Sequence, residues 1–237
     1  MNMLRSRYLP SGLVLIALVL LLQVTPALAA KNPNPGVLPP DSNPFGKTYG
    51  EWSNAWWQWA YSIPEPNNPM LDTTGVNCGV GQSSNVWFLA GTFGTLSGTT
   101  ITRTCTVPHG KALFFPIFNA ENDNIGVTPP LTADQLRAAL NQFFDCCVDP
   151  NTFSAVVDGV AIQQLGNYRA GPHNPVFSFT LPVNNIYPGT PPAGTYSPVV
   201  SDGYYLMLAP LSTGTHTIHF VALSGGQDVT YTLTIGS

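Results

Sequence analysis

An almost continuous apolar run, residues 111–118, stands in the middle of the chain and leads into a cluster of carboxylates and carboxamides. A run this short, rich in aromatic residues and bounded by turn residues predicts a strand that is buried on both faces. Beyond it, Asn119, Glu121 and Asp123 occupy every second position, so in an extended chain their side chains point the same way. The cluster therefore predicts either a shared polar site or a hydrated loop at the rim of a sheet.

A segment rich in tryptophan predicts a helix before the strands begin. Thr48 and Glu51 match a capping box, and the helical pattern continues to about Tyr61, ahead of Pro64. Trp57 falls outside the main aromatic face, which consists of Tyr49, Trp52, Trp56 and Trp59. We expect this face to pack against a sheet, and stacking of exposed tryptophans on sugar rings is the alternative.

A second capping box predicts a short helix over residues 132–144. Thr132 supplies the cap and Gln135 is the third helical residue. Apolar side chains recur at helical spacing along this segment, and we expect this face to point to the core: Leu136, Leu140 and Phe143.

Short apolar segments alternate with turn residues along the rest of the chain. Besides the central run, strands are expected at residues 85–91, 101–107, 175–181, 203–208, 215–223 and 228–235. Asp158 and Gly159 carry the signature of a two-residue hairpin turn. Many short strands without β-α-β alternation predict an all-β fold, namely an antiparallel β-sandwich or jelly roll with an N-terminal Trp-rich helix and a second short helix.

The N-terminal 29 residues have the order of parts found in a secretory signal peptide. Arg5 and Arg7 precede an apolar run at residues 13–22, and the small residues of an A-x-A cleavage site follow at residues 27–29. This run is about half as long as the roughly 20 residues that a membrane span requires. We therefore expect a secreted protein, periplasmic or extracellular, without a membrane span.

The remaining chain divides into a lead-in and one domain. Residues 30–46 are rich in proline, which cannot donate to a sheet, and predict an extended lead-in on the surface. The 22 glycines and 23 prolines are spread along the whole length, so no obvious linker divides the rest. Residues 47–237 are therefore expected to form a single β-sandwich domain with capping helices.

The small number of charged residues and the negative net charge limit the classes of molecule that this chain can be expected to bind. Charged residues make up 8% of the chain, whereas ordinary soluble domains contain roughly 25%. Solubility must then rest on neutral polar side chains, as in many extracellular β proteins. The formal net charge of −4 argues against nucleic acid as a partner.

Four cysteines in an exported chain favour disulfides, with three possible connectivities. Pairing of Cys78 with Cys105 is the first choice, because it would fix a Gly-rich loop to a strand. It leaves Cys146 and Cys147 to pair with each other. The alternative is that one of these neighbours pairs elsewhere and the other stays free.

Metal chemistry has one candidate in this sequence. The four histidines form no zinc signature, since His216 and His219 are three apart on a predicted strand and face opposite sides. Asn119, Glu121 and Asp123 supply the hard oxygen ligands that calcium prefers, although their spacing is not that of an EF-hand. Calcium is therefore the expected ion if a metal binds at all.

Catalytic motifs with a nucleophile, a phosphate-binding loop or a dinucleotide fingerprint do not occur in the sequence. What remains for an enzyme is a pair of carboxylates acting as acid and base, as in glycoside hydrolysis. The candidates for this pair are Glu51, Glu121, Asp123 and Asp202.

Four segments together resemble a group of secreted microbial proteins. They are residues 51–59 (E-W-S-N-A-W-W-Q-W), 86–94 (V-W-F-L-A-G-T-F-G), 103–118 (R-T-C-T-V-P-H-G-K-A-L-F-F-P-I-F) and 201–220 (S-D-G-Y-Y-L-M-L-A-P-L-S-T-G-T-H-T-I-H-F). The resemblance covers most of the chain after the predicted signal peptide. It implies export and a single β domain, and it carries no catalytic assignment.

Two functions from different classes fit these patterns. The leading hypothesis is a secreted, non-catalytic β-sandwich protein that binds a glycan or another extracellular or cell-surface partner through Trp57, Gln58, Tyr204 and Tyr205. It requires at least one of these aromatic side chains to lie in solvent. The alternative is a secreted hydrolase acting on polysaccharide, which requires two of the candidate carboxylates to face one cleft about 5 to 10 Å apart. The sequence leaves open which class applies, the identity of the ligand and the oligomeric state.

Overall fold

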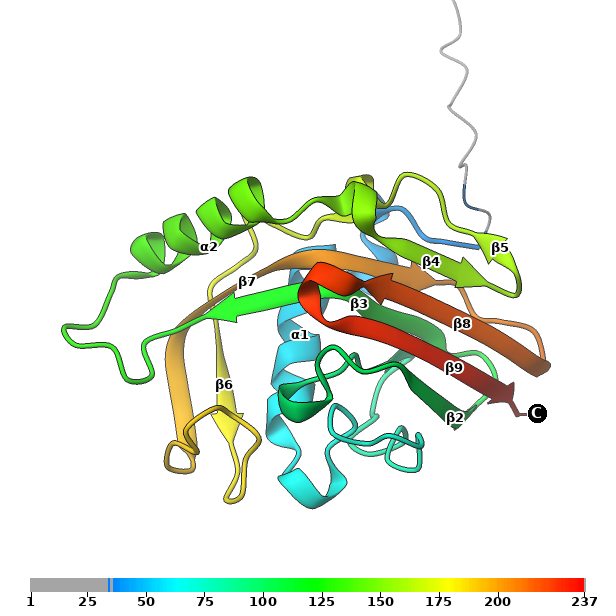
Figure 1. Ribbon diagram of the computed structural model, residues 1–237, viewed down its shortest axis with the longest axis horizontal. Coiled ribbons are helices and arrows are strands. Elements are labelled where there is room, and N and C mark those ends of the chain that lie inside the picture. The colour runs from blue at the N-terminus through cyan, green and yellow to red at the C-terminus, as the bar shows by residue number, and fades with distance from the viewer. Residues whose placement is uncertain (1–33, 35, 237) are drawn as a thin grey trace, which may run out of the picture. The chain divides into compact units, whose positions relative to one another are not determined.

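Two β-sheets form the framework of the computed structural model, which describes residue 34 and residues 36–236 (Figure 1). One sheet has the strand order β1-β3-β7-β6, with bounds Val86–Phe88, Ala112–Asn122, Gly194–Leu208 and Phe177–Leu181. The other has the order β2-β9-β8-β4-β5, with bounds Ile101–Val107, Gln227–Ile235, Gly214–Ala222, Ser154–Val157 and Val160–Ala161. The helices are α1, Tyr49–Ser62, and α2, Ala133–Cys147. The β-rich class expected from the sequence is confirmed.

Parallel and antiparallel pairs occur in both sheets. β1 runs parallel to β3, and β2 runs parallel to β9, whereas the other strand pairs are antiparallel. The expectation of a purely antiparallel fold is therefore wrong at these two pairs. The physical reason is the path of the chain. Between β1 and β3 the chain passes through β2 in the other sheet, and between β2 and β9 it passes through residues 108–226, so both pairs have the long crossover that parallel neighbours need.

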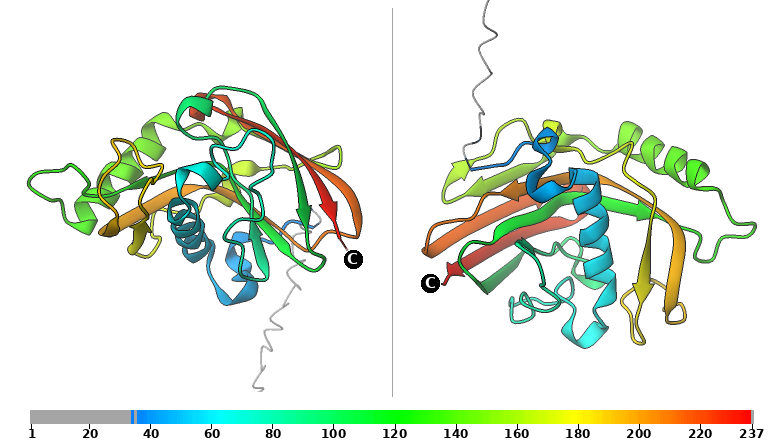
Figure 2. Two further views of the ribbon diagram at one scale, coloured as in Figure 1. Left: turned by 90° about the horizontal axis from the view of Figure 1, so that it is seen from below. Right: turned by 180° about the vertical axis from the view of Figure 1, so that it is seen from behind.

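The central strand β3 is fully buried along its first half, as the apolar run predicts. Its two faces meet different layers. Phe114 stacks on Tyr205 at a centroid distance of 5.0 Å and contacts Trp52 of α1. Phe115 points the other way, onto Phe220 of β8. β3 therefore lies between α1 on one side and the second sheet on the other (Figure 2).

A bulge interrupts β3 between Pro116 and Phe118. One extra residue reverses the alternation of side chains along the strand. As a result, Phe118 turns toward Phe144 of α2, and Asn119 turns toward the face that α1 covers. The bulge thus decides which side chains of the polar cluster meet the Trp-rich helix.

The start of α1 has the predicted capping box. The hydroxyl of Thr48 accepts a hydrogen bond from the backbone of Glu51, and the Glu51 carboxylate accepts one from the backbone of Thr48. The aromatic face packs inward as expected, and its indole N–H groups bond to backbone carbonyls. Trp56, for example, donates to Leu89 at 3.0 Å. Trp57 is buried too, with 5% of its surface exposed.

The second helix is one turn longer than expected, although its capping box of Thr132 and Gln135 is as predicted. Its buried face consists of Leu136, Leu140 and Phe144, whereas Phe143 is 42% exposed. The expected core position was therefore wrong by one residue, because the longer helix continues the four-residue spacing to Phe144.

Covalent and turn features follow the sequence closely. Disulfides join Cys78 to Cys105 and Cys146 to Cys147. Asp158 and Gly159 have φ angles of 50° and 78° between β4 and β5, as a two-residue hairpin with a primed turn requires.

The predicted signal peptide lies outside the described residues. The described part of the lead-in is less superficial and less extended than expected. Val37 is buried and bridges Leu208 at the end of β7, and two 3₁₀ turns, Pro40–Ser42 and Pro44–Gly46, follow. Proline fits the first position of such turns because it needs no backbone donor there. Within residues 34 and 36–236, no helix is both long and apolar enough to cross a bilayer.

Candidate functional site

A cavity of about 380 Å³ lies beside β3, beyond the point where β1 ends. Its aromatic walls are Trp56, Trp57, Tyr61, Phe93, Phe118 and Tyr187. Polar side chains are added by Thr92, Ser97, Asn119, Glu121 and Gln227. The cavity therefore combines residues of α1, β3, the segment after β1 and the loop between β6 and β7.

The side chain of Gln227 is one of the groups that fix the segment after β1 to the second sheet. Gln227, the first residue of β9, accepts a hydrogen bond from the backbone N–H of Thr92 at 2.7 Å and donates to the carbonyl of the same residue at 3.0 Å. This paired contact holds the backbone next to Phe93 in place, so that wall of the cavity is set before any ligand arrives.

Glu121 points into the space between β3 and α1. Its Oε1 accepts a hydrogen bond from the hydroxyl of Tyr61 at 3.1 Å, and it lies opposite Ser201 of β7 in the strand register. Burial, followed by the negative charge of Asp123, raises the pKa of Glu121 to about 8. Glu121 is therefore a neutral carboxylic acid at pH 7.

The second carboxyl oxygen of Glu121, Oε2, differs from Oε1 in its contacts. Oε2 is buried and has no hydrogen-bond partner. The neighbouring side chain of Asp123 adds to the effect of burial on the pKa of Glu121, so it is one of the groups that keep Glu121 protonated.

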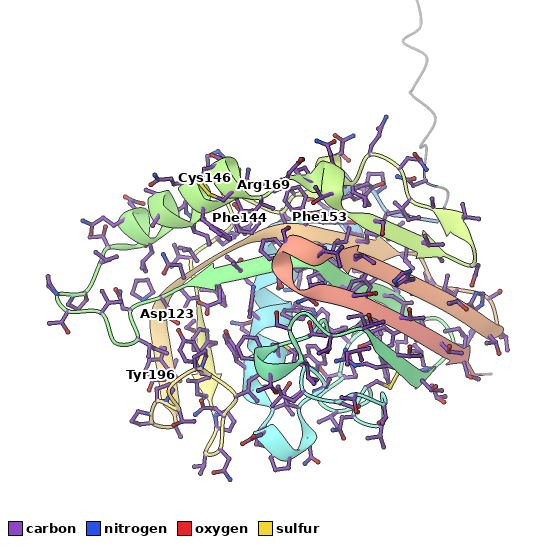
Figure 3. All side chains as sticks on the ribbon, in the orientation of Figure 1. Asp123, Phe144, Cys146, Phe153, Arg169 and Tyr196 are labelled. Atoms are coloured by element: carbon purple, nitrogen blue, oxygen red, sulfur yellow. A yellow bond between two sulfur atoms is a disulfide. The ribbon has the colours of Figure 1, made fainter. Side chains whose placement is uncertain are left out.

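Two hydrogen bonds hold the side chain of Asp123, just after the end of β3 (Figure 3). Only 6% of its surface is exposed, and its two oxygens accept hydrogen bonds from the backbone of Ile125 at 2.6 Å and from the hydroxyl of Tyr187 at 2.8 Å. Burial, and then the charges of Glu121 and Asp123, raise the pKa of Tyr187, so that hydroxyl keeps its proton.

Trp57 lines the cavity instead of facing solvent. Its ring lies 5.1 Å from Trp56, edge to face, and 5.1 Å from Tyr61, tilted. The indole Nε1 is buried without a hydrogen bond of good geometry, near the hydroxyl of Tyr205. The tryptophan that the sequence singled out is thus an inner wall of a cavity, with an unused donor.

The other proposed ligand-binding residues lie elsewhere. Tyr205 is fully buried between Phe114 and α1, and Tyr204 is 5% exposed on the opposite face of the sheet. Gln58 is exposed on α1, donates to the carbonyl of Ser178 and does not line the cavity. None of these side chains forms the exposed aromatic platform that the leading hypothesis required.

The four candidate carboxylates separate into three places. Glu51 caps the start of α1 and is ten residues from Tyr61, which is about 15 Å along a helix axis. Asp202 is fully buried on the opposite face of the sheet from Glu121, and it pairs with Arg169 at 2.7 Å. Only Glu121 and Asp123 lie together, close enough for Asp123 to raise the pKa of Glu121.

The calcium expectation concerns the same cluster. Within the described part of the chain, no three His, Cys, Asp or Glu side chains are grouped as metal ligands. Asn119 donates its amide N–H to the hydroxyl of Tyr205 at 3.0 Å, which leaves its oxygen for other contacts. A calcium ion would require Glu121 to be ionised, against the preference set by burial.

Several lining residues were not foreseen from the sequence. Tyr61 follows Trp57 by four positions, so the two share a face of α1, and this spacing was an available signal. Tyr187 lies in an irregular segment between β6 and β7, where no periodicity marks it.

No protein-family model matches the chain, and neither a curated protein nor a solved structure matches it.

Proposed function

We propose that this protein is an exported glycan-binding protein with a β-sandwich scaffold, and that it holds a sugar residue in the cavity beside β3. The observation that carries the proposal is an aromatic cavity that also offers polar side chains, Asn119 and Glu121 among them, which is the combination that a sugar ring and its hydroxyl groups need.

The size and lining support a small carbohydrate group. A volume of about 380 Å³ falls within the roughly 300 to 1,000 Å³ of small-molecule sites. Aromatic rings offer flat apolar faces to the C–H groups of a sugar ring, and Glu121 and Asn119 offer polar contacts at its edge. The two disulfides are consistent with function in an oxidising compartment.

Replacement of Tyr187 by alanine tests the binding site. This half-buried residue forms one wall, so Tyr187→Ala should weaken glycan binding at least tenfold with little loss of fold. Glycans retained by the wild type on an array would be titrated by calorimetry. The matched control is Tyr196→Ala, which removes a half-buried tyrosine that does not line this cavity. Equal losses in both variants, or no glycan retained by the wild type, would refute the proposal.

The second candidate is a hydrolase acting on polysaccharide. It is favoured by one observation, the neutral Glu121 at pH 7, since a protonated carboxyl can act as general acid. The same preparation is therefore screened for polysaccharide hydrolysis. Hydrolysis that disappears in Glu121→Gln, with glycan binding kept, would replace the binding proposal by the enzyme. Hydrolysis that persists in this variant would exclude the acid role.

A further inference from the structure

Among the described residues, the lining of the cavity contains one acidic residue and no basic one. Glu121 is in its lining, and none of the described residues that line it is Lys, Arg or His. The groups that face Glu121 are Tyr61 from α1, Asp123 after β3 and Tyr187 from the loop between β6 and β7. A ligand bearing a carboxylate, sulfate or phosphate would therefore find no positively charged partner in this lining.

The aromatic walls add to this preference. The ring centroids of Tyr61 and Tyr187 are 5.5 Å apart, and those of Trp57 and Tyr61 are 5.1 Å apart. The faces of such rings attract cations, most strongly where water is excluded. A continuous aromatic wall next to a carboxyl group is the environment that a bound ammonium group needs.

Starting from the proposed glycan site, we propose that its ligand is an amino sugar whose protonated amine lies beside Glu121 and whose ring packs against the aromatic wall. Charge complementarity supports this class over neutral and acidic sugars. Asp123, held by two hydrogen bonds, contributes further negative potential. The sugar hydroxyls take the polar contacts described above.

Binding of an ammonium group changes the protonation of Glu121, and this change predicts how the affinity depends on pH. The pKa of Glu121 is about 8, so this carboxyl group is protonated at pH 6. A bound ammonium favours the ionised carboxylate, and the proton leaves to solvent. Affinity for a permanently charged ligand should therefore rise between pH 6 and pH 8. A neutral sugar gains nothing from this ionisation.

Three trisaccharides that differ at the 2-position distinguish the outcomes. Tri-glucosamine, its N-acetylated counterpart and cellotriose are titrated into the protein by calorimetry at pH 7, closer to the pKa of Glu121. We expect tri-glucosamine to bind at least tenfold more tightly than the other two. Equal or weaker binding of tri-glucosamine would overturn the amino-sugar inference and leave the glycan site standing. No binding of any saccharide, on these titrations or on the array, would overturn both.

A charge-removing variant tests the role of the carboxyl group. Glu121→Gln keeps the shape and removes the charge, so the preference for tri-glucosamine should fall to near onefold. Glu65→Gln is the matched control, because Glu65 is exposed and outside the cavity, and it should keep the full preference. If Glu121→Gln does not fold, the inference is tested on the wild type instead. Its affinity for N-trimethylglucosamine is measured at pH 6 and pH 8 and should rise between them. A flat or falling affinity would overturn the inference.

Discussion

At the scale of single residues, Glu121 links the stability of the fold to pH. Its pKa in the folded protein is about 8, compared with 4.5 for an unperturbed glutamate, because burial disfavours its charge. The folded state therefore holds a proton that the unfolded state releases between these two values. The stabilisation is complete below about pH 4.5 and is lost as the pH rises through 8, at up to roughly 1.4 kcal/mol per pH unit.

Glu121→Gln should remove this part of the pH dependence. We expect the free energy of unfolding of the wild type to fall between pH 5 and pH 8, and that of the variant to fall less. Urea titrations at four pH values across this range measure both. Parallel curves would contradict the raised pKa.

Repeating the series with millimolar calcium tests whether this ion binds. Binding by Asn119, Glu121 and Asp123 would stabilise the wild type most at pH 8.

At the scale of elements, one ion pair fixes α2 to the sheet. Arg169 donates to both oxygens of the buried Asp202 on β7, reaches Asp145 of α2 at 2.6 Å, and lies over the ring of Phe144 (Figure 3). Asp202 is fully buried, and burial raises its pKa while Arg169 opposes that shift. The arginine is therefore the group that makes a charged Asp202 tolerable in this position.

Arg169→Ala should destabilise the protein by about 3 kcal/mol, because it leaves a buried carboxylate without its partner. Chemical denaturation followed by tryptophan fluorescence measures the loss. The control Arg137→Ala, a partly exposed arginine of α2, should cost much less. Adding Asp202→Asn to Arg169→Ala should recover part of the loss, and no recovery would argue against the electrostatic explanation.

Elements with local signals were predictable from the sequence. Both capping boxes, the hairpin at Asp158 and the full extent of β2 depend on residues close together in the chain. The first half of β7 was missed, because Gly194 and Pro198 gave that segment the appearance of a turn. The two parallel pairs were missed for a different reason: the choice of strand partner depends on the path of the whole chain.

At the scale of the whole molecule, the two disulfides differ in what they enclose. Cys78 and Cys105 are 27 residues apart and join the loop before β1 to β2, whereas Cys146 and Cys147 are neighbours at the end of α2. On the chain-entropy model, the longer loop contributes about 3.5 kcal/mol and the vicinal bridge about 1 kcal/mol. Global stability should therefore depend on the first bridge far more than on the second.

Paired alanine variants separate these contributions. Cys78→Ala with Cys105→Ala should lower the free energy of unfolding by about 3 kcal/mol. Cys146→Ala with Cys147→Ala serves as the matched control and should lower it by about 1 kcal/mol or less. Urea unfolding under identical conditions compares them. Equal losses would show that loop closure is not the source of the stabilisation.

The site was predictable only in part. Alternation along the central run pointed to Glu121 and Asp123, and the helical wheel set Trp57 apart from the packing face. The bulge in β3 could not be inferred from the sequence pattern, although it decides that Glu121 faces α1. The contribution of Tyr187 could not be inferred either, because this residue reaches the cavity from an irregular loop. A cavity depends on the packing of distant segments, and local patterns do not contain that information.

The position of β9 also has a consequence for the newly made chain. β9 lies between β2 and β8, and Arg103 of β2 pairs in register with Tyr231 of β9, 128 residues later. At ribosomal speeds, β2 waits roughly 6 to 26 seconds for its neighbour to be synthesised. During this interval one edge of β2 is open to pairing with other chains. The newly made chain must therefore be kept apart from other chains until β9 pairs with β2 and the second sheet is complete.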